Sequence, residues 1–227
     1  MVSTNYQKVK AELDAFCKTA GRFDDIPKLI CVSKTVGPDE VACAIEDGAT
    51  DFGENRVGEL VLKQELFPQV RWHFIGNIQH RDIPQIVKHA ALIHSVYKID
   101  HLHRIDNAAA SIGKIQDILV EVNVVGEESK GGLAPSNLPA FLEEALKYPH
   151  IRVCGLMTMA PQGIDSAIHR SFEGLASLLK QSQEVLSSDS FGELSMGMSE
   201  DWKVAVSCGS SMIRLGRAVF DVEFENH

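Results

Sequence analysis

The sequence predicts a (β/α)8 barrel, in which eight parallel strands close into a cylinder inside a ring of helices. The chain has 227 residues, a length typical of one such barrel. Eight short β-prone stretches alternate with segments whose apolar residues recur at helical spacing. The connections are short, and no linker, internal repeat or low-complexity tract interrupts the alternation. We therefore expect one α/β domain over residues 1–227, with an extra helix at its N-terminus.

Each element is predicted from its own local pattern. Residues 3–20 carry apolar side chains at helical spacing and precede Gly21, which gives the extra amphipathic helix. Short apolar runs predict strands at 29–33, 50–53, 71–75, 91–95, 115–123, 151–157, 193–195 and 212–215. Helical periodicity predicts helices at 38–48, 54–66, 83–89, 99–112, 138–146, 168–179 and 200–207. Pro38 and Gly48 mark the ends of one of these helices, because proline favours the first turn and glycine ends a helix.

An open, doubly wound sheet is the alternative arrangement of the same elements. Such sheets often carry a Gly-x-Gly-x-x-Gly turn after the first strand, and none follows residues 29–33. The sequence also lacks Gly-x-Ser-x-Gly, His-Glu-x-x-His and Walker motifs. His101 and His103 lie two apart on a predicted helix, so they face different directions and form a poor metal pair.

Composition narrows the class of protein. The net charge is −9, from 31 acidic and 22 basic residues, and this balance favours neither nucleic acid nor an anionic membrane as a partner. The five cysteines form no C-x-x-C pair, which favours a reducing compartment over a disulfide framework. We expect a cytoplasmic protein, because the sequence shows no apolar signal core and no apolar run of membrane-spanning length.

Polar residues gather at the carboxyl ends of the predicted strands. In a barrel these ends form one face, and binding and catalytic sites are built there. The residues in question are Lys34, Asn55, Gly76, Asn77, Ser95, Asn123, Thr158, Ser195 and Arg214. Any one of them is compatible with an ordinary loop, but together they predict a site on this face.

Lys34 is the candidate for covalent chemistry. It follows the apolar run 29–33, so its side chain would extend from a packed interior into a cavity. Burial lowers the pKa of a lysine and frees its amine as a nucleophile, which suits a Schiff base with an aldehyde. The alternative is a lysine that extends its ammonium group to water from the end of a strand.

Two glycine-containing stretches suit a phosphate group. Residues 195–199 read SMGMS and lead into a predicted helix, and residues 214–218 read RLGRA and follow the last strand. Glycine allows close approach of the backbone, and N–H groups at a helix start point towards an anion. Barrels commonly bind phosphate after strands seven and eight. The alternative is that Gly197 and Gly216 only permit tight turns.

Seven motifs occur in an order that resembles one known family. They are VSKT (32–35), FGENRV (52–57), WHFIG (72–76), GEESKG (126–131), GLM (155–157), LSMGMS (194–199) and RLG (214–216). This pattern, from about Leu29 to Phe220, is similar to the pyridoxal phosphate homeostasis proteins, the YggS/PROSC group. Those proteins resemble the barrel half of alanine racemase. Two stretches depart from the family pattern, 77–82 and 219–221, and both lie beside the expected site.

The resemblance implies a cofactor and the residues that hold it. Lys34 would carry pyridoxal 5′-phosphate (PLP) as a Schiff base, and Arg214 would face its pyridine nitrogen. Ser195, Ser199 and the backbone of Gly216 and Arg217 would hold the phosphate, and Asn55 would lie near the ring. The family implies binding, storage or delivery of PLP in vitamin B6 homeostasis, without an established reaction. We accordingly expect no enzyme activity, a monomer, and PLP-dependent apoenzymes as recipients.

Two enzyme functions remain as alternatives. One is a PLP-dependent amino-acid racemase with weak or lost activity, in which Lys34 supplies one of two bases. In the related racemases the second base is a tyrosine from another domain, and Tyr6, Tyr97 and Tyr148 do not match its position. The other alternative is a barrel enzyme that forms a Schiff base between Lys34 and a phosphorylated sugar.

Overall fold

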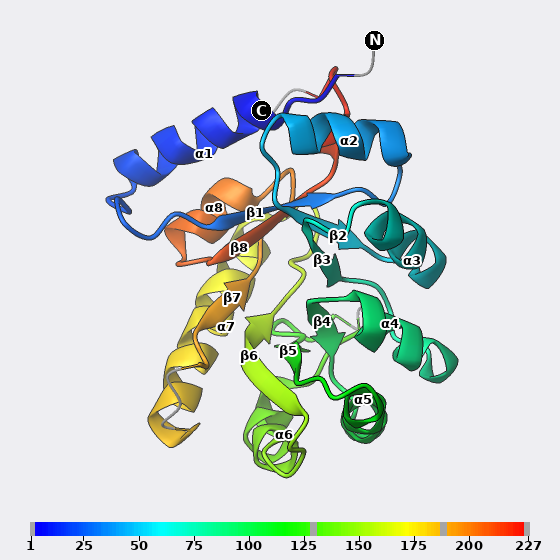
Figure 1. The fold of residues 1–227 in the computed structure, drawn as a ribbon. Coiled ribbons are helices and arrows are strands. Elements are labelled where there is room, and N and C mark those ends of the chain that lie inside the picture. Colours follow the sequence, from blue (N-terminus) through cyan, green and yellow to red (C-terminus); the bar gives the residue numbers. More distant parts are fainter. Residues whose placement is uncertain (1–2, 128–130, 187–189, 225–227) are drawn as a thin grey trace.

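Eight parallel strands close into a barrel in the computed structural model, which describes residues 3–127, 131–186 and 190–224 (Figure 1). Each strand pairs with the next along the chain, and β1 pairs with β8 to close the cylinder. The strands are β1 (Lys28–Val32), β2 (Asp51–Glu54), β3 (Arg71–Phe74), β4 (Leu92–Val96), β5 (Gln116–Glu121), β6 (Ile151–Met157), β7 (Glu193–Ser195) and β8 (Met212–Leu215). The predicted (β/α)8 fold is confirmed, and the open sheet is excluded.

Helices surround the barrel in the expected order. They are α1 (Tyr6–Thr19), α2 (Pro38–Glu46), α3 (Val57–Leu66), α4 (Ile83–His89), α5 (Ile99–Ser111), α6 (Leu138–Ala145), α7 (Asp165–Leu186), α8 (Trp202–Ser207) and α9 (Arg217–Phe220), with short 3-10 turns η1 (His80–Asp82) and η2 (Pro135–Asn137). None of the helices in the described ranges is long and apolar enough to cross a membrane.

The extra N-terminal helix α1 packs outside the barrel. Its buried face includes Val9, Leu13 and Cys17, which share one side at helical spacing. Phe16 meets Trp202 of α8 edge to face, with ring centroids 5.5 Å apart. The main-chain N–H of Asn5 donates to the carbonyl of Val219 at 2.7 Å, so the N-terminal segment lies against the end of α9.

The bounds of some helices differ from the predictions. The helix expected at 200–207 begins at Trp202, because the Asp201 carboxylate accepts the Met198 N–H at 2.5 Å and holds a turn there. The helix expected at 168–179 runs over Asp165–Leu186, and the four-residue helix α9 was not predicted. In the GEESKG motif, residues 128–130 lie outside the described residues.

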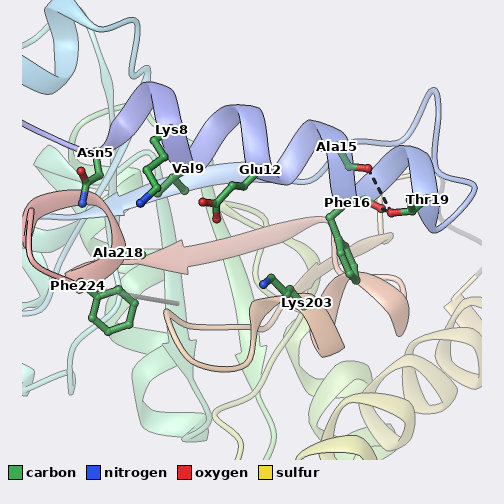
Figure 2. Close-up of a pocket in the computed structure, with 10 residues that line it drawn as sticks. All are labelled: Asn5, Lys8, Val9, Glu12, Ala15, Phe16, Thr19, Lys203, Ala218 and Phe224. Carbon is green, nitrogen blue, oxygen red and sulfur yellow. Dashed lines mark hydrogen bonds between the residues drawn. The ribbon is translucent and has the colours of Figure 1, made fainter. Parts of the chain in front are cut away.

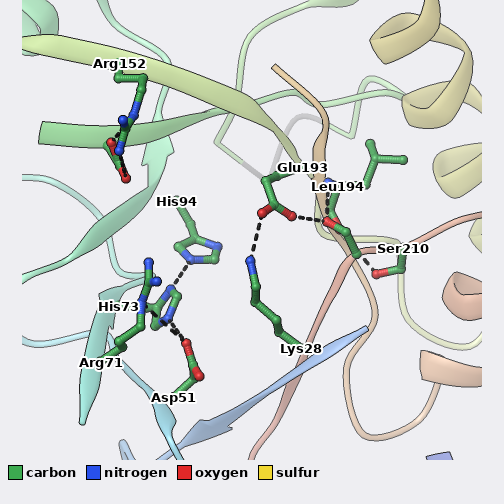
Figure 3. Close-up of polar contacts among 11 residues, drawn as sticks. Lys28, Asp51, Arg71, His73, His94, Arg152, Glu193, Leu194 and Ser210 are labelled. Carbon is green, nitrogen blue, oxygen red and sulfur yellow. Dashed lines mark hydrogen bonds and ion pairs between the residues drawn. The ribbon is translucent and has the colours of Figure 1, made fainter. Parts of the chain in front are cut away.

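Strand side chains alternate between the helix-covered surface and the barrel interior. Ile30, Leu92, Leu119, Met157 and Met212 form a separate apolar cluster inside the barrel. At the amino end of the barrel, charged residues from different strands form ion pairs. Figure 3 shows the ion pair of Lys28 with Glu193, whose charged atoms are 2.8 Å apart. The amino end of the barrel is therefore closed by paired charges, and the opposite end is left to carry the site.

Candidate functional site

Lys34 lies in the turn between β1 and α2, two residues beyond the end of the strand. Its side chain is exposed. The side chain of Lys34 is therefore not buried as expected, although the preceding residue, Ser33, is fully buried and its N–H donates to the carbonyl of Gly53 in β2. Burial of the side chain is therefore not an argument for a nucleophilic amine at Lys34.

A second lysine, Lys63 of α3, hydrogen-bonds to the main chain of this turn. Its side chain is only 1% exposed, and its Nζ donates to the carbonyls of Ser33 and Val36, both at 2.9 Å. The third hydrogen bond of the ammonium group goes to Oε1 of Glu54 at 2.7 Å. A lysine has three N–H donors, so all of them are used. The main chain on both sides of Lys34 is thus fixed by one buried cation.

Glu54 completes this buried group at the end of β2. Its Oε1 also accepts the Ser33 hydroxyl at 2.6 Å. Its Oε2 is buried and has no hydrogen-bond partner among the described residues. Glu54 therefore pairs with Lys63 and Ser33.

Arg214 is a buried cation on the inner side of β8, 5% exposed. Its Nη1 donates to Oγ of Ser195 at 2.6 Å and its Nη2 to the carbonyl of Thr158 at 3.0 Å. No carboxylate pairs with it among the described residues. Burial lowers its pKa to about 10, although Asp201 and Glu121 act against this shift, so it stays a guanidinium at neutral pH. Two of its five N–H groups donate to residues in the described part of the chain, and the other three have no partner there.

Ser195 lies deeper than the expected phosphate site. It is fully buried at the end of β7, where its Oγ lies 2.6 Å from Nη1 of Arg214 and 2.9 Å from Nδ1 of His94. Its hydroxyl is therefore engaged inside the barrel and does not lie on the loop that follows.

The two predicted phosphate loops meet each other at the rim. Oγ of Ser199, in the loop after β7, accepts the main-chain N–H of Ala218 in α9 at 3.2 Å. Gly197 in the same loop has a φ of +99°, and a Cβ at this position would come within 2.7 Å of Ala205. Gly216 lies beside β1, since a Cβ added to it would be 3.2 Å from the carbonyl oxygen of Val32. The Gly216 loop and the Lys34 turn are therefore neighbours.

The remaining predicted residues divide into exposed and structural ones. Asn55 is exposed after β2, and the exposed Arg217 pairs with Glu200 at 2.7 Å. Ser95, Asn123 and Thr158 donate to the main-chain carbonyls of Gly76, Glu127 and Val122, respectively, at 2.5, 2.8 and 2.7 Å. These three side chains close loops.

Sequence reasoning missed three buried polar residues of this site: Lys63, Glu121 and His94. Glu121 ends β5 inside the barrel, where burial raises its pKa to about 7 against the opposing influence of Arg214. Glu121 and His94 lie two positions from Leu119 and Leu92, which face the barrel interior, but these strands are buried on nearly all sides, so the sequence alone does not mark the pattern.

A separate hollow of about 600 Å³ lies along α1, outside the barrel, and Ala218 of α9 is among the residues that line it (Figure 2). Val9, Phe16, Lys203 and Phe224 are among its lining residues. None of the predicted site residues lines it, so we place the site at the barrel rim.

The rim residues fit a planar, phosphorylated aldehyde. An exposed amine, a buried guanidinium with free donors and two adjoining glycine loops are the groups that an aldehyde, a ring acceptor and a phosphate require.

Residues 5–223 match the alanine racemase N-terminal domain family. A pyridoxal phosphate homeostasis protein from Aquifex aeolicus is 34% identical over 215 residues, 94% of this chain and 94% of that protein.

The chain belongs to the pyridoxal phosphate homeostasis protein family. The human pyridoxal phosphate homeostasis protein is 34% identical over 209 residues, which cover 86% of this chain and 76% of the human one. The solved structure of PipY from Synechococcus elongatus PCC7942, described as having PLP bound, superposes with a TM-score of 0.84. It is 29% identical, and the match covers 95% of this chain and 99% of PipY. The resemblance found in the sequence motifs is confirmed at the level of the family and the fold.

Proposed function

We propose that this chain binds PLP, holds it as a Schiff base on Lys34, and serves PLP homeostasis in the cytoplasm without catalysing a reaction. The observation that carries the proposal is the buried Arg214 guanidinium, which has no carboxylate partner among the described residues and keeps three donors free. Arg214 lies on β8, two residues before Gly216. Gly216 lies close to the carbonyl oxygen of Val32, which is two residues before Lys34. The names of the relatives support PLP as the ligand.

Each rim residue has a role in this proposal. The amine of Lys34 would condense with the aldehyde, whose oxygen leaves as water, and Asn55 would lie near the ring. The Ser199 hydroxyl and the main-chain N–H groups of Gly216 and Arg217 bind the phosphate. Ser195 does not bind the phosphate in this proposal, because its hydroxyl is held between His94 and Arg214. Its role is to support Arg214.

Arg214 also supports the non-enzymatic assignment. PLP supplies an electron sink for carbanions when its ring nitrogen is protonated. A guanidinium is only a donor, so Arg214 hydrogen-bonds to this nitrogen in its unprotonated form, in which the ring is a weaker sink. Racemisation is the alternative function, since the related racemases use an arginine at this position. Racemisation also needs a second base, which is a tyrosine in the related racemases. Tyr6 lies on α1, outside the barrel, and its hydroxyl donates to the main-chain carbonyl of Gly48.

A spectroscopic titration with PLP tests the proposal. We expect a visible absorbance band with the wild type and with Lys10→Ala, an exposed control on α1. The band should be absent from Lys34→Ala. The same preparations should show no turnover in a panel of amino acids assayed for racemisation and transamination. A band that survives in Lys34→Ala would overturn the site, and robust turnover by the wild type would overturn the non-enzymatic role. The monomeric state and delivery to apoenzymes belong to the same proposal and are tested by sedimentation and by transfer assays.

A further inference from the structure

A row of buried polar side chains crosses the barrel interior and ends at Arg214. We propose that Asp51, His73 and His94 form a one-directional hydrogen-bond relay that positions Ser195 and, through it, Arg214 for the ring nitrogen of the ligand. The histidines are positioning residues in this proposal. The existence and direction of the relay rest on the protein alone, whereas its effect on the ligand rests on the proposed function.

The geometry is continuous. Oδ1 of Asp51 lies 3.0 Å from Nε2 of His73, and Nδ1 of His73 lies 2.9 Å from Nε2 of His94. Nδ1 of His94 then lies 2.9 Å from Oγ of Ser195, which accepts from Arg214. Figure 3 shows Asp51, His73 and His94 in a row. The chain of contacts starts on β2, passes through β3 and β4, and crosses to β7 and β8.

The charge of Asp51 gives the relay its direction. Burial alone would raise the pKa of Asp51, but hydrogen bonds from His73 and Thr50 outweigh it and lower the pKa, so the carboxylate is ionised and can only accept. His73 must then donate from Nε2, which leaves its Nδ1 as an acceptor. His94 in turn donates from Nε2 and accepts at Nδ1. The Ser195 hydroxyl therefore donates to His94, and its oxygen accepts from Arg214.

Both imidazoles are neutral in this arrangement. Burial lowers the pKa of His73 against the opposing effect of Asp51, and burial followed by the nearby His73 and Arg214 lowers that of His94 further. The other charges at this end of the barrel are Arg71, 3.8 Å from Asp51, and Lys28, which pairs with Glu193. Arg71 and Lys28 both disfavour a cationic His73.

The opposite direction is incompatible with an ionised Asp51. It would place a bare His73 nitrogen against a carboxylate oxygen at 3.0 Å, two acceptors without a proton between them. It would also release the Ser195 proton for a ligand. In the direction we propose, that proton is committed to His94, and Ser195 serves only to hold Nη1 of Arg214. Thr158 holds Nη2, so the guanidinium plane is fixed at two points.

The first test needs no ligand. Nitrogen-15 NMR of histidine-labelled protein at pH 7 reports which ring nitrogen carries the proton. We expect His73 and His94 both in the Nε2–H form, with each signal assigned by its loss in His73→Gln or His94→Gln, and both signals retained in His89→Gln. His89 is a buried histidine of α4 that hydrogen-bonds to Gln85 outside the relay. An Nδ1–H form at His73 or His94 would overturn the relay.

The second test measures the coupling to the ligand. The probes are PLP and its deaza analogue, in which a C–H replaces the ring nitrogen. Loss of one well-placed hydrogen bond corresponds to a roughly threefold to tenfold weaker affinity. We expect this loss for PLP with His94→Gln and with Ser195→Ala, which removes a single oxygen, but not with His89→Gln. The deaza analogue should bind the wild type and the relay variants equally.

Three outcomes are decisive. Equal losses for PLP and the deaza analogue, or no loss for PLP in either relay variant, would overturn the coupling. A wild-type protein that fails to bind PLP would refute the proposed function, while the NMR result still decides whether the relay exists. If His94→Gln does not fold, Ser195→Ala carries the affinity measurement alone.

Discussion

The ammonium group of Lys63 lies 2.7 Å from a carboxylate oxygen of Glu54, and both side chains are buried beneath the turn that carries Lys34. Removing one partner from a buried ion pair leaves an uncompensated charge and typically costs about 3–5 kcal/mol. We therefore predict that Lys63→Met lowers the free energy of unfolding by about that amount, measured in urea. Lys147→Met is the control, because Lys147 pairs with Glu144 on the surface. Similar small losses in both variants would contradict this description of the turn.

The Gly216 loop gives a prediction about phosphate recognition. A Cβ at Gly216 would already lie 3.2 Å from the carbonyl oxygen of Val32, so the larger side chain of Gly216→Val must displace the rim next to Lys34. We expect PLP affinity to fall at least about tenfold. Pyridoxal, which lacks the phosphate, should lose little. Gly58→Ala is the control, since nothing lies within 4 Å of the added Cβ on α3. Equal losses for both aldehydes would remove the phosphate assignment.

Glu121 makes the stability of the protein depend on pH. Its pKa is raised from 4.5 to about 7 by burial, with Arg214 acting in the opposite direction. Between these values the folded state binds more protons than the unfolded one, so stability falls as pH rises from about 4.5 to 7. Glu121→Gln removes this titration and should be more stable than the wild type by up to about 3 kcal/mol at pH 8.

The measurement for Glu121 is urea unfolding of both proteins between pH 5 and 8. The stability difference should be small at pH 5 and grow towards pH 8. The titrations of His73 and His94 are common to both proteins and cancel in this difference. Glu143→Gln, on the exposed side of α6, is the control and should show no such trend. A difference that stays constant with pH would show that Glu121 is not held in its protonated form.

The fold was predictable from the sequence because its signals are local. All eight strands and their intervening helices follow from apolar runs, helical spacing and boundary residues such as Pro38. The errors are at boundaries set by single contacts. Asp201 delays the start of α8, and a four-residue helix such as α9 has too few residues to show a period.

The site was only partly predictable, because its chemistry depends on contacts between distant strands. The family motifs led to Lys34 and Arg214, but they did not show that Lys34 is exposed. Lys63 reads as an ordinary surface lysine of an amphipathic helix, although it is buried. His94 lies in a strand that is buried on both sides, where apolar and polar residues alternate too weakly to mark it. Its contact with Ser195, 101 positions away, has no local signature.

Lys34 as the point of attachment is the central claim, and peptide mapping after borohydride reduction tests it most directly. The wild-type protein is loaded with PLP, reduced, digested and analysed by mass spectrometry for a phosphopyridoxyl group on lysine. We predict one stoichiometric adduct, on the peptide that contains Lys34, and none on the peptide that contains Lys63, whose amine is buried and fully hydrogen-bonded. A stoichiometric adduct on any other lysine, or no adduct in a protein that binds PLP, would contradict the claim.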